Sequence, residues 1–574
     1  MAKVARVLVE KDMPIKLRDG VTTYADVFRP LEGPPAPVVV VRTPYDKEVS
    51  MGGLGVLPQW VKLAERGYAV VVQDTRGRAS SEGIFYPFAH EGEDGVDTVG
   101  WAAKQPWSNG RVGVLGASYF GATTMLAAKE QPAGLACIVP IITADDYHAG
   151  WAYQGGAFEL GFMGTWGAGL AAAQFLRADC PVSPAARKEI LGAMADPMAM
   201  LSHLPIATMP GMSNPEVAPY WKDWTAHTAD TGYWQRWRIA DAHDRIATPG
   251  FHIGGWFDIF LGGTLRNFQG MQAAGRAPQK LLIGPWAHTG YDRYLGALEF
   301  GPTGGAAFSG VIADINHWLD RHLRGDESVD TGPAVRYFVM GANEWRSDET
   351  WPPKGSTVAR WYLHSGGSAN SLRGNGTLSR LQPAGDEPTD VFLYDPGRPV
   401  PTGGGNLLVA PVRQPGPFDQ QAIEQRDDVL CYTSEPLAAS LTVAGPVRLT
   451  LHAATDGPDT DWTAKLVDVF PDGRAINLCD GILRARYRTS RQEAELLNLG
   501  EVYTYDIDLV GTAYQFAAGH RLRLEVSSSN FPRFDRNTNT GGDIANESSW
   551  RVAVQRVVHT AARPSALEVT VTDG

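Results

Sequence analysis

The sequence predicts a mixed α/β protein with a helical insertion and an all-β carboxyl-terminal region. Strand-like and helix-like segments alternate up to about residue 142 and again from 249 to 323, which is typical of a mainly parallel sheet. Between them, residues 147–241 are helix-like and hold six of the seventeen tryptophans, most of which we expect to pack a small core of their own. Beyond about 355, short alternating runs separated by turn residues predict an antiparallel sandwich or jelly roll.

The first expected region, residues 1–146, begins with a hairpin around the turn Arg18-Asp-Gly20. Residues 37–41 are nearly all valine, which indicates a strand buried on both faces. The region's strands are predicted at 4–17, 21–28, 37–41, 68–73, 112–115 and 135–142. Its helices are predicted at 57–66, 93–104 and 122–129.

Three further regions complete the expected organisation: a helical cap at 147–241, the second part of the sheet domain at 242–354, and a β-sandwich at 355–574. In the second part, strands are predicted at 249–258 and 280–283 and helices at 262–273 and 313–323. The clearest strands of the last region are predicted at 447–452, 463–470, 502–509, 520–526 and 566–571.

The composition excludes several classes of partner. With 44% hydrophobic and 20% charged residues, the 574-residue chain can form large cores, and it is too long for one. A net charge of -12 argues against nucleic acid and anionic membrane surfaces as partners. No signal peptide and no run of about 20 apolar residues is evident, so we expect a cytoplasmic protein that acts on a small, uncharged or weakly charged molecule.

The cysteine pattern and the known metal motifs point to no metal and no cofactor. The four cysteines lie far apart, without a CxxC motif or a nearby histidine, so we expect them to be buried and reduced. An HExxH motif and a glycine-rich phosphate loop are also missing. The cysteines are Cys137, Cys180, Cys431 and Cys479.

Ser118 stands where a catalytic nucleophile would. A buried strand ends at Gly116-Ala-Ser118-Tyr-Phe-Gly121, which departs from the nucleophile elbow GxSxG because its second glycine comes one residue later. Small residues allow a tight strand-to-helix turn, and the helix amino terminus behind the serine suits a developing oxyanion. A corner between strand and helix without catalytic function is an equally good interpretation of this motif alone.

A base and its orienting acid follow later strands. Asp258 comes directly after one apolar strand and His288 shortly after the next, so the chain order Ser118, Asp258, His288 matches an α/β-hydrolase arrangement. Since the carboxyl ends of parallel strands meet at one sheet edge, we expect the three side chains to converge there. Among the other histidines, His252 lies within a strand and His148 at the entry to the insertion. We expect His317 and His322, on a charged helix, to be surface groups.

Other polar groups near the predicted strand ends are open to two interpretations. The Tyr119 N–H, which follows the nucleophile, is one oxyanion donor that the fold provides, and the Tyr45 phenol is either the second donor or a packing group in its turn. The motif Gln73-Asp-Thr-Arg-Gly77 and the acidic run 91–97 could perform acid-base or metal chemistry. Capping of the helix at 93–104 and pairing with Arg76 is their favoured role.

With these residues assembled, the sequence resembles the bacterial cocaine esterase group of the X-prolyl dipeptidyl aminopeptidase-like serine hydrolases, over essentially its whole length. The long matches are RTPYDK at 42–47, QDTRG at 73–77, GASYFG at 116–121, GWFD at 255–258, GPWAH at 284–288, DWTAKLVDVFPDGR at 461–474 and VSSSNFP at 526–532. They are specific to this family.

The resemblance implies an α/β-hydrolase domain interrupted by a helical cap and followed by a jelly roll. It also implies a triad of Ser118, Asp258 and His288 with the Tyr45 hydroxyl and the Tyr119 N–H as oxyanion donors. The implied wall of the acyl pocket is Trp151, Trp166 and Phe260, with Leu408 and Val409 from the third domain. The sequence departs from the family pattern at 174–225 and at Val409, so we do not predict cocaine itself as the substrate.

From residues and resemblance together we expect a serine carboxylesterase that hydrolyses small esters with aromatic or apolar acyl groups. An amide or aminoacyl hydrolase is the alternative, but it needs a carboxylate site for the substrate's ammonium group, for which Glu159, Asp145 and Asp146 are the candidates. A non-catalytic binding protein on this fold is disfavoured by the intact set of three residues. Free edges of the sandwich would allow a homodimer.

Overall fold

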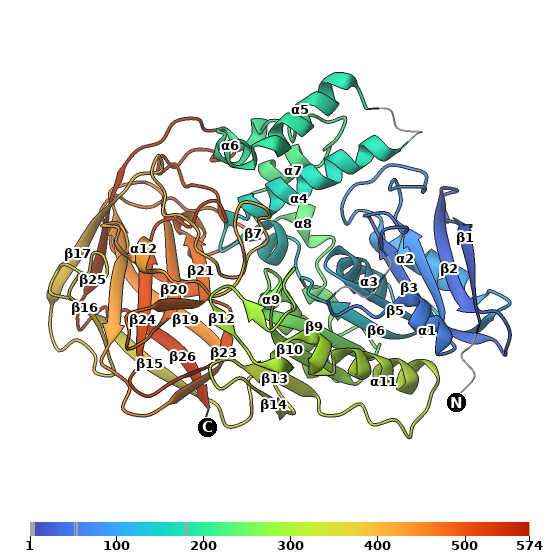
Figure 1. The fold of residues 1–574 in the computed structure, drawn as a ribbon. Helices are drawn as coiled ribbons and strands as arrows, with labels where there is room; N and C mark the ends of the chain where they lie inside the picture. Colours follow the sequence, from blue (N-terminus) through green and yellow to red (C-terminus); the bar gives the residue numbers. More distant parts are fainter. Residues whose placement is uncertain (1–5, 51, 53–54, 178–181, 573–574) are drawn as a thin grey trace.

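A computed structural model describes residues 6–50, 52, 55–177 and 182–572 of the chain. A large α/β sheet region and a carboxyl-terminal β region lie side by side, and the helices of the insertion sit above both (Figure 1). The predicted strand start at Val4 and the state of Cys180 lie outside the described residues. Among those residues, no helix is both long and apolar enough to cross a membrane.

Ten strands of the described chain form one mixed sheet in the order β1-β2-β4-β3-β5-β6-β9-β10-β13-β14. The strands from β4 to β13 in this order are parallel, and β1, β2 and β14 are antiparallel additions at the two edges. Their bounds are β1 Val7–Lys16, β2 Thr22–Pro30, β3 Ala36–Thr43, β4 Ala69–Asp74, β5 Ser108–Ala117, β6 Leu135–Ile141, β9 Gly250–Phe257, β10 Gln279–Ala287, β13 Val335–Val339 and β14 Glu344–Asp348.

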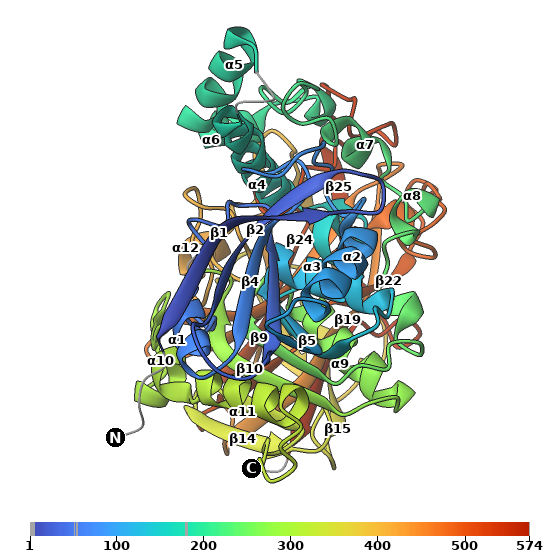
Figure 2. The ribbon, with the colours of Figure 1, turned by 90° about the vertical axis from the view of Figure 1, so that its right-hand side faces the viewer.

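Helices cover both faces of this sheet, as Figure 2 shows. Strand β3 is buried on both sides, as its valines predict: Val38 and Val40 pack with the α2–α3 side, and Val39 and Val41 with the α1–α11 side. Arg76 pairs with Asp94 in the first turn of α2, which confirms that part of the expected pairing. The helices are α1 Trp60–Glu65, α2 Glu91–Ala103, α3 Tyr119–Lys129, α9 Leu261–Ala274, α10 Ala306–Ser309 and α11 Val311–Leu323.

The insertion is helical but irregular, with two longer helices, α4 and α5, of which α4 leads away from the sheet edge (Figure 1). Its tryptophans Trp221, Trp224 and Trp234 are fully buried in the same cluster as aromatic rings of the sheet domain. They therefore do not form an isolated core, because the insertion is packed directly on the sheet region. Its elements are β7 Tyr153–Gln154, β8 Ala157–Phe158, α4 Leu160–Ala173, α5 Pro184–Ala195, α6 Pro197–Ser202, α7 Trp221–Ala226 and α8 Gly232–Gln235, with short turns of helix at His148–Ala152, Gln174–Leu176, Ile206–Thr208 and Ala240–Ala242.

The carboxyl-terminal region is all-β apart from short helices, as expected, and twelve of its described strands form one network. Each predicted strand of this region overlaps an observed one, and none extends beyond it by more than one residue at either end. The hairpin of β13 and β14 that precedes the region was not predicted. The elements are β15 Thr357–His364, β16 Gly376–Ser379, β17 Glu387–Tyr394, α12 Gln421–Glu424, β18 Leu430–Ser434, β19 Leu441–Thr455, β20 Asp461–Val469, β21 Ala475–Arg484, β22 Tyr503–Asp508, β23 Thr512–Phe516, β24 Arg521–Ser527, β25 Ala553–His559 and β26 Ala566–Thr572.

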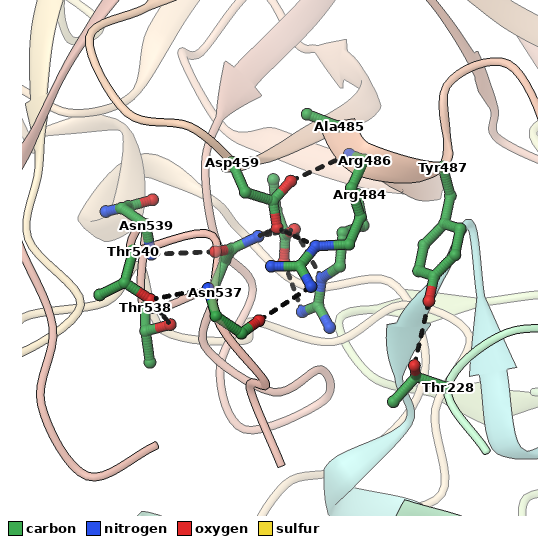
Figure 3. Close-up of polar contacts among 12 residues, drawn as sticks. Thr228, Asp459, Arg484, Ala485, Arg486, Tyr487, Asn537, Thr538, Asn539 and Thr540 are labelled. Atoms are coloured by element: carbon green, nitrogen blue, oxygen red, sulfur yellow. Dashed lines mark hydrogen bonds and ion pairs between the residues drawn. The ribbon is translucent and has the colours of Figure 1, made fainter. Parts of the chain in front are cut away.

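Polar contacts hold the loops of the β region together and join them to the insertion. Figure 3 shows Asp459 accepting hydrogen bonds from Arg486, at 2.7 Å, and from Asn537, at 2.8 Å. In the same view the hydroxyls of Tyr487 and Thr228 lie 3.0 Å apart, which links strand β21's end to the insertion. Because buried polar groups stabilise a structure only when they are paired, the contacts of Asp459 fix the loops of the β region, and the Tyr487–Thr228 contact ties those loops to the insertion.

A buried ion pair lies at the start of α4. Glu159 directly precedes this helix and is 4% exposed, and its Oε1 is 3.5 Å from Arg533, which also binds Asp480 at 2.5 Å. Burial outweighs the attraction of Arg533 and raises the pKa of Glu159 to about 7. Glu159 therefore keeps its proton to a higher pH than an exposed glutamate does, at the junction between the insertion and the β region.

A Glu159→Gln variant should be more stable than wild type at pH 8, with little difference at pH 4.5. The folded protein holds the Glu159 proton more tightly than the unfolded chain does, so this group's stabilisation is lost as the pH rises from about 4.5 to about 7. Glutamine keeps the shape without ionising, and we expect a gain on the order of 1–3 kcal/mol at pH 8.

Thermal unfolding at both pH values measures the difference. Glu435→Gln is the matched control, since that side chain is 93% exposed, and it should give no pH-dependent gain. A Glu159→Gln effect that is the same at both pH values would contradict the prediction.

Candidate active site

The nucleophile candidate Ser118 lies at a tight turn between β5 and α3. Its backbone has φ 60° and ψ −124°, a conformation that costs free energy for a residue with a side chain. Gly116 allows this turn, because a Cβ there would lie 2.3 Å from the Phe120 Cβ. The Ser118 N–H donates to the carbonyl of Ile141 at 3.0 Å, which anchors the turn to the neighbouring strand β6.

The displaced second glycine of the motif has a packing reason. A Cβ on Gly121 would lie 2.7 Å from the Thr143 Cβ and 3.0 Å from the Ile141 carbonyl oxygen. Helix α3 therefore presses against the end of β6 one residue later than in a GxSxG elbow. The strand-to-helix turn is present although the spacing of the motif differs.

Ser118, His288 and Asp258 lie in hydrogen-bond contact at the carboxyl edge of the sheet. His288 Nε2 is 2.9 Å from Ser118 Oγ, and His288 Nδ1 is 2.6 Å from Asp258 Oδ1. Asp258 is fully buried and His288 is nearly so, while Ser118 is partly exposed. The three residues follow β5, β9 and β10, so parallel strands bring them together from distant parts of the chain, in the geometry of a serine nucleophile with its base and orienting acid.

The backbone around Asp258 is held by the β region. Asn406 is 6% exposed and its amide group donates to the carbonyls of Trp256, at 2.7 Å, and of Asp258 itself, at 3.2 Å. The Asp258 Oδ2 accepts from the N–H of Phe260 at 3.1 Å. Both oxygens of the carboxylate and the adjacent carbonyl are thus held, which fixes the direction in which Asp258 faces His288.

Tyr119 begins helix α3, so its N–H is among the first-turn donors that have no partner within the helix. Its ring is fixed from the other side, because its hydroxyl donates to Glu91 at 3.0 Å and accepts from the Phe88 N–H at 2.8 Å. Glu91 is in turn paired with Arg42 at 2.9 Å.

Tyr45 lies in the loop after β3, the strand next to β5. Its hydroxyl oxygen accepts a hydrogen bond from the Trp166 indole N–H at 2.8 Å, so its own proton is available for another acceptor. Desolvation raises the pKa of Tyr45 to about 12, although Trp166, Arg78 and Ser118 each act to lower it. The phenol therefore remains a hydrogen-bond donor at neutral pH, near Ser118.

The residues expected to line an acyl pocket form a cluster of aromatic rings beside His288. The Trp151 and Phe260 rings stack with centroids 4.1 Å apart, and Phe260 meets the His288 ring edge-on at 5.2 Å. Trp166 is 5.5 Å from Trp151. The β region supplies Leu408, which is half-buried, and Val409, which is 1% exposed and packs in the same cluster.

The carboxylates considered as an ammonium site are all paired with arginines. Asp145 binds Arg266 through two hydrogen bonds of 2.7 and 2.9 Å, and Asp146 accepts from Arg238 at 3.0 Å. Glu159 faces Arg533, as described above. Among the described residues, no group of three or more His, Cys, Asp or Glu side chains could hold a metal ion.

The competing histidines have partners away from Ser118. His252 contacts the Gln279 Oε1 at 3.0 Å inside the sheet, and His148 contacts the Thr228 carbonyl at 3.0 Å. His317 is exposed on α11, as expected, whereas His322 is half-buried against Trp318, which corrects the expectation of a surface group. Cys137, Cys431 and Cys479 are free and buried.

Two family models match the chain. Residues 19–290 match the X-Pro dipeptidyl-peptidase (S15 family), and residues 327–568 match the X-Pro dipeptidyl-peptidase C-terminal non-catalytic domain. The sequence is 39% identical over 567 residues to cocaine esterase from Rhodococcus sp., covering 97% of each chain.

Solved structures agree over the full length. An aminopeptidase from a marine sediment Thaumarchaeota archaeon superposes with a TM-score of 0.83 at 26% identity, covering 100% of this chain and 97% of that one. An α-amino acid ester hydrolase superposes with a TM-score of 0.80 at 25% identity, covering 100% and 98%. The predicted α/β fold with a carboxyl-terminal β domain is confirmed.

Two contacts of the site were not foreseen from the sequence. Trp166 was expected only as a wall, but its indole N–H binds Tyr45. Asn406 was not singled out, although it stands two residues before Leu408 in the loop that reaches the site. Neither has a motif of its own, because each depends on how a distant loop is folded.

An Asn406→Ala variant should lower kcat about tenfold with little change in KM. Loss of the amide removes one hydrogen bond from each of two buried carbonyls, and that of Asp258 keeps only the bond from the Leu261 N–H, so the backbone that aims Asp258 at His288 is held less firmly. Asn370→Ala is the matched control, since this amide also donates to two backbone carbonyls, at 3.0 and 2.8 Å, but within the β region. Steady-state ester hydrolysis measures both, and equal effects on kcat would contradict the prediction.

Proposed function

The chain belongs to the X-Pro dipeptidyl-peptidase (S15) family of serine hydrolases, and we propose that its Ser118, His288 and Asp258 hydrolyse small carboxylic esters through an acyl-enzyme. The observation that carries this proposal is the continuous contact from Ser118 Oγ through His288 to Asp258, at 2.9 and 2.6 Å. Its similarity to cocaine esterase over 97% of the chain identifies it as a serine esterase.

The geometry suggests how each group acts. His288 Nε2 takes the Ser118 proton as Oγ attacks the ester carbonyl, and Asp258 holds the imidazole and stabilises its protonated form. The Tyr45 hydroxyl and the Tyr119 N–H donate to the oxyanion of the tetrahedral intermediate. His288 then gives its proton to the leaving alcohol, and water repeats the sequence on the acyl-enzyme and releases the acid.

An aromatic or otherwise apolar acyl group fits the side chains around the site. Trp151, Trp166 and Phe260 form one continuous ring cluster, to which Leu408 and Val409 add aliphatic surface from the β region. Such surfaces bind a ligand by removing its apolar area from water, at about 25 cal/mol per Å². The substrate is a small ester with no requirement for nucleic acid or a membrane.

Esters are favoured over aminoacyl amides because none of the three carboxylates considered for a substrate ammonium group is unpaired. Asp145, Asp146 and Glu159 each face an arginine instead. An ammonium ion would have to compete with these guanidinium groups for the same oxygens.

We also propose the domain bounds, the location and the oligomeric state that the sequence predicts. Regions 1–146 and 242–354 would form the hydrolase domain, 147–241 the cap and 355–574 the jelly roll. A cytoplasmic location and a homodimer through the edges of the β region are proposed on the same footing.

Wild-type protein should hydrolyse 4-nitrophenyl benzoate at least a hundredfold faster, by kcat/KM, than glycyl-prolyl 4-nitroanilide. The benzoate offers an aromatic acyl group, whereas the anilide needs a site for its ammonium group. Initial rates of 4-nitrophenol and 4-nitroaniline release measure the ratio. A preference for the anilide would contradict the esterase proposal and move the chain to the peptidase branch of its family.

A further inference from the structure

Arg78 is a buried arginine beside the loop that carries Tyr45. It follows β4 and is 2% exposed. Its Nε donates to the Pro44 carbonyl at 2.7 Å, and its Nη1 donates to the Leu170 carbonyl at 3.1 Å. The guanidinium also lies over the Phe85 ring, 4.9 Å from its centroid.

This guanidinium has no carboxylate partner among the residues that the structure describes. Other deeply buried arginines do have one: Arg42 pairs with Glu91 at 2.9 Å, and Arg484 with two aspartates at 2.8 and 2.9 Å. Leaving a buried charge without a counter-ion costs several kcal/mol, and two backbone carbonyls offset only part of that cost. Burial accordingly lowers the pKa of Arg78, and the titratable groups around it are Tyr45, Tyr119, Tyr220 and another cation, Arg177.

The two carbonyls that Arg78 binds belong to the two segments that hold the Tyr45 hydroxyl. Pro44 directly precedes Tyr45 in the loop after β3. Leu170 lies one turn after Trp166 on α4, and the Trp166 N–H donates to the Tyr45 oxygen at 2.8 Å. Arg78 therefore joins the loop and the helix at the point where both contact the phenol.

The far side of the same loop is fixed by a different group. The Asp74 Oδ1 accepts from the Lys47 N–H at 2.7 Å, and Asp74 ends the strand that leads to Arg78. Residues 74–78 thus bind the chain on both sides of Tyr45. Of these two contacts, only that of Arg78 brings a positive charge that has no paired anion among the described residues.

We propose that Arg78 is the fixed cation of the oxyanion hole. It positions Tyr45 through the carbonyls of Pro44 and Leu170, and its uncompensated charge stabilises the oxyanion through the Tyr45 O–H dipole. The charge that lacks a partner in the free protein gains one when negative charge develops on the substrate oxygen in the transition state. Arg78 does not touch the substrate, so it is a positioning residue. This inference rests on the proposed role of Tyr45.

The test is a double-mutant cycle on 4-nitrophenyl benzoate. Tyr45→Phe alone should lower kcat about a hundredfold, the usual effect of losing one oxyanion donor. Arg78→Met alone should lower kcat tenfold to a hundredfold with KM changed by less than about threefold. In the Tyr45→Phe background, Arg78→Met should cost less than about twofold, because its effect passes through the phenol.

Two further measurements separate electrostatics from folding. Arg78→Lys keeps the charge but loses the planar fork that reaches both carbonyls, so it should retain more activity than Arg78→Met. The affinity for phenylboronic acid, whose tetrahedral adduct carries the oxyanion's charge, should fall with kcat/KM across the variants, while affinity for benzoate stays the same. Arg336→Met is the control, since Arg336 also donates to a backbone carbonyl, that of Ser309, away from the site.

Each failure has a distinct signature. If Tyr45→Phe has little effect, the proposed role of Tyr45 is wrong and the inference falls with it. If Tyr45→Phe is slow but Arg78→Met costs the same factor in both backgrounds, Arg78 is only structural. If Arg78→Met does not fold, Arg78→Lys decides the matter: unchanged kcat and unchanged boronate affinity in both backgrounds would overturn the inference.

Discussion

The strained backbone at Ser118 is the constraint on which the rest of the site depends. A φ of 60° at a residue with a side chain persists only where the surroundings hold it, and here the turn is held by close contacts on both sides. Gly116 lets Phe120 approach, and Gly121 lets α3 press on the end of β6. The turn lifts Ser118 Oγ to the sheet edge, where the loops after β9 and β10 present Asp258 and His288. The same helix start leaves the Tyr119 N–H without a partner within the helix, where we propose that it donates to the oxyanion.

Three regions of the chain meet at this edge, and each contributes a different kind of group. The sheet domain supplies the contacting side chains Ser118, His288 and Asp258, and the insertion supplies Trp166, which binds the Tyr45 oxygen. The β region, whose family model is described as non-catalytic, nevertheless holds the carbonyl of Asp258 through Asn406. Arg533 connects this loop to the insertion, because its side chain faces Glu159 and its N–H donates to the Thr402 hydroxyl, four residues before Asn406. The β region therefore affects the geometry of the site without taking part in bond making.

Much of the fold follows from local patterns, because strands buried on both faces and amphipathic helices have characteristic periods. The valines of β3 and the order of Ser118, Asp258 and His288 allowed the sheet and the convergence of these residues to be predicted. The hairpin of β13 and β14 escaped prediction, because short edge strands have weak patterns. The contacts of Arg78 and Asn406 could not be predicted for another reason. Each side chain binds backbone carbonyls, and every residue has a carbonyl, so no sequence pattern marks these positions. Family resemblance, not periodicity, pointed to Tyr45.

The identity of the nucleophile is the central claim, and labelling with a fluorophosphonate tests it most directly. We expect wild-type protein to take up one phosphonyl group on the peptide that contains Ser118, with ester hydrolysis lost in proportion to labelling. A Ser118→Ala variant should neither be labelled nor hydrolyse 4-nitrophenyl benzoate. A label on another residue, or ester turnover that survives in Ser118→Ala, would contradict the assignment of the site.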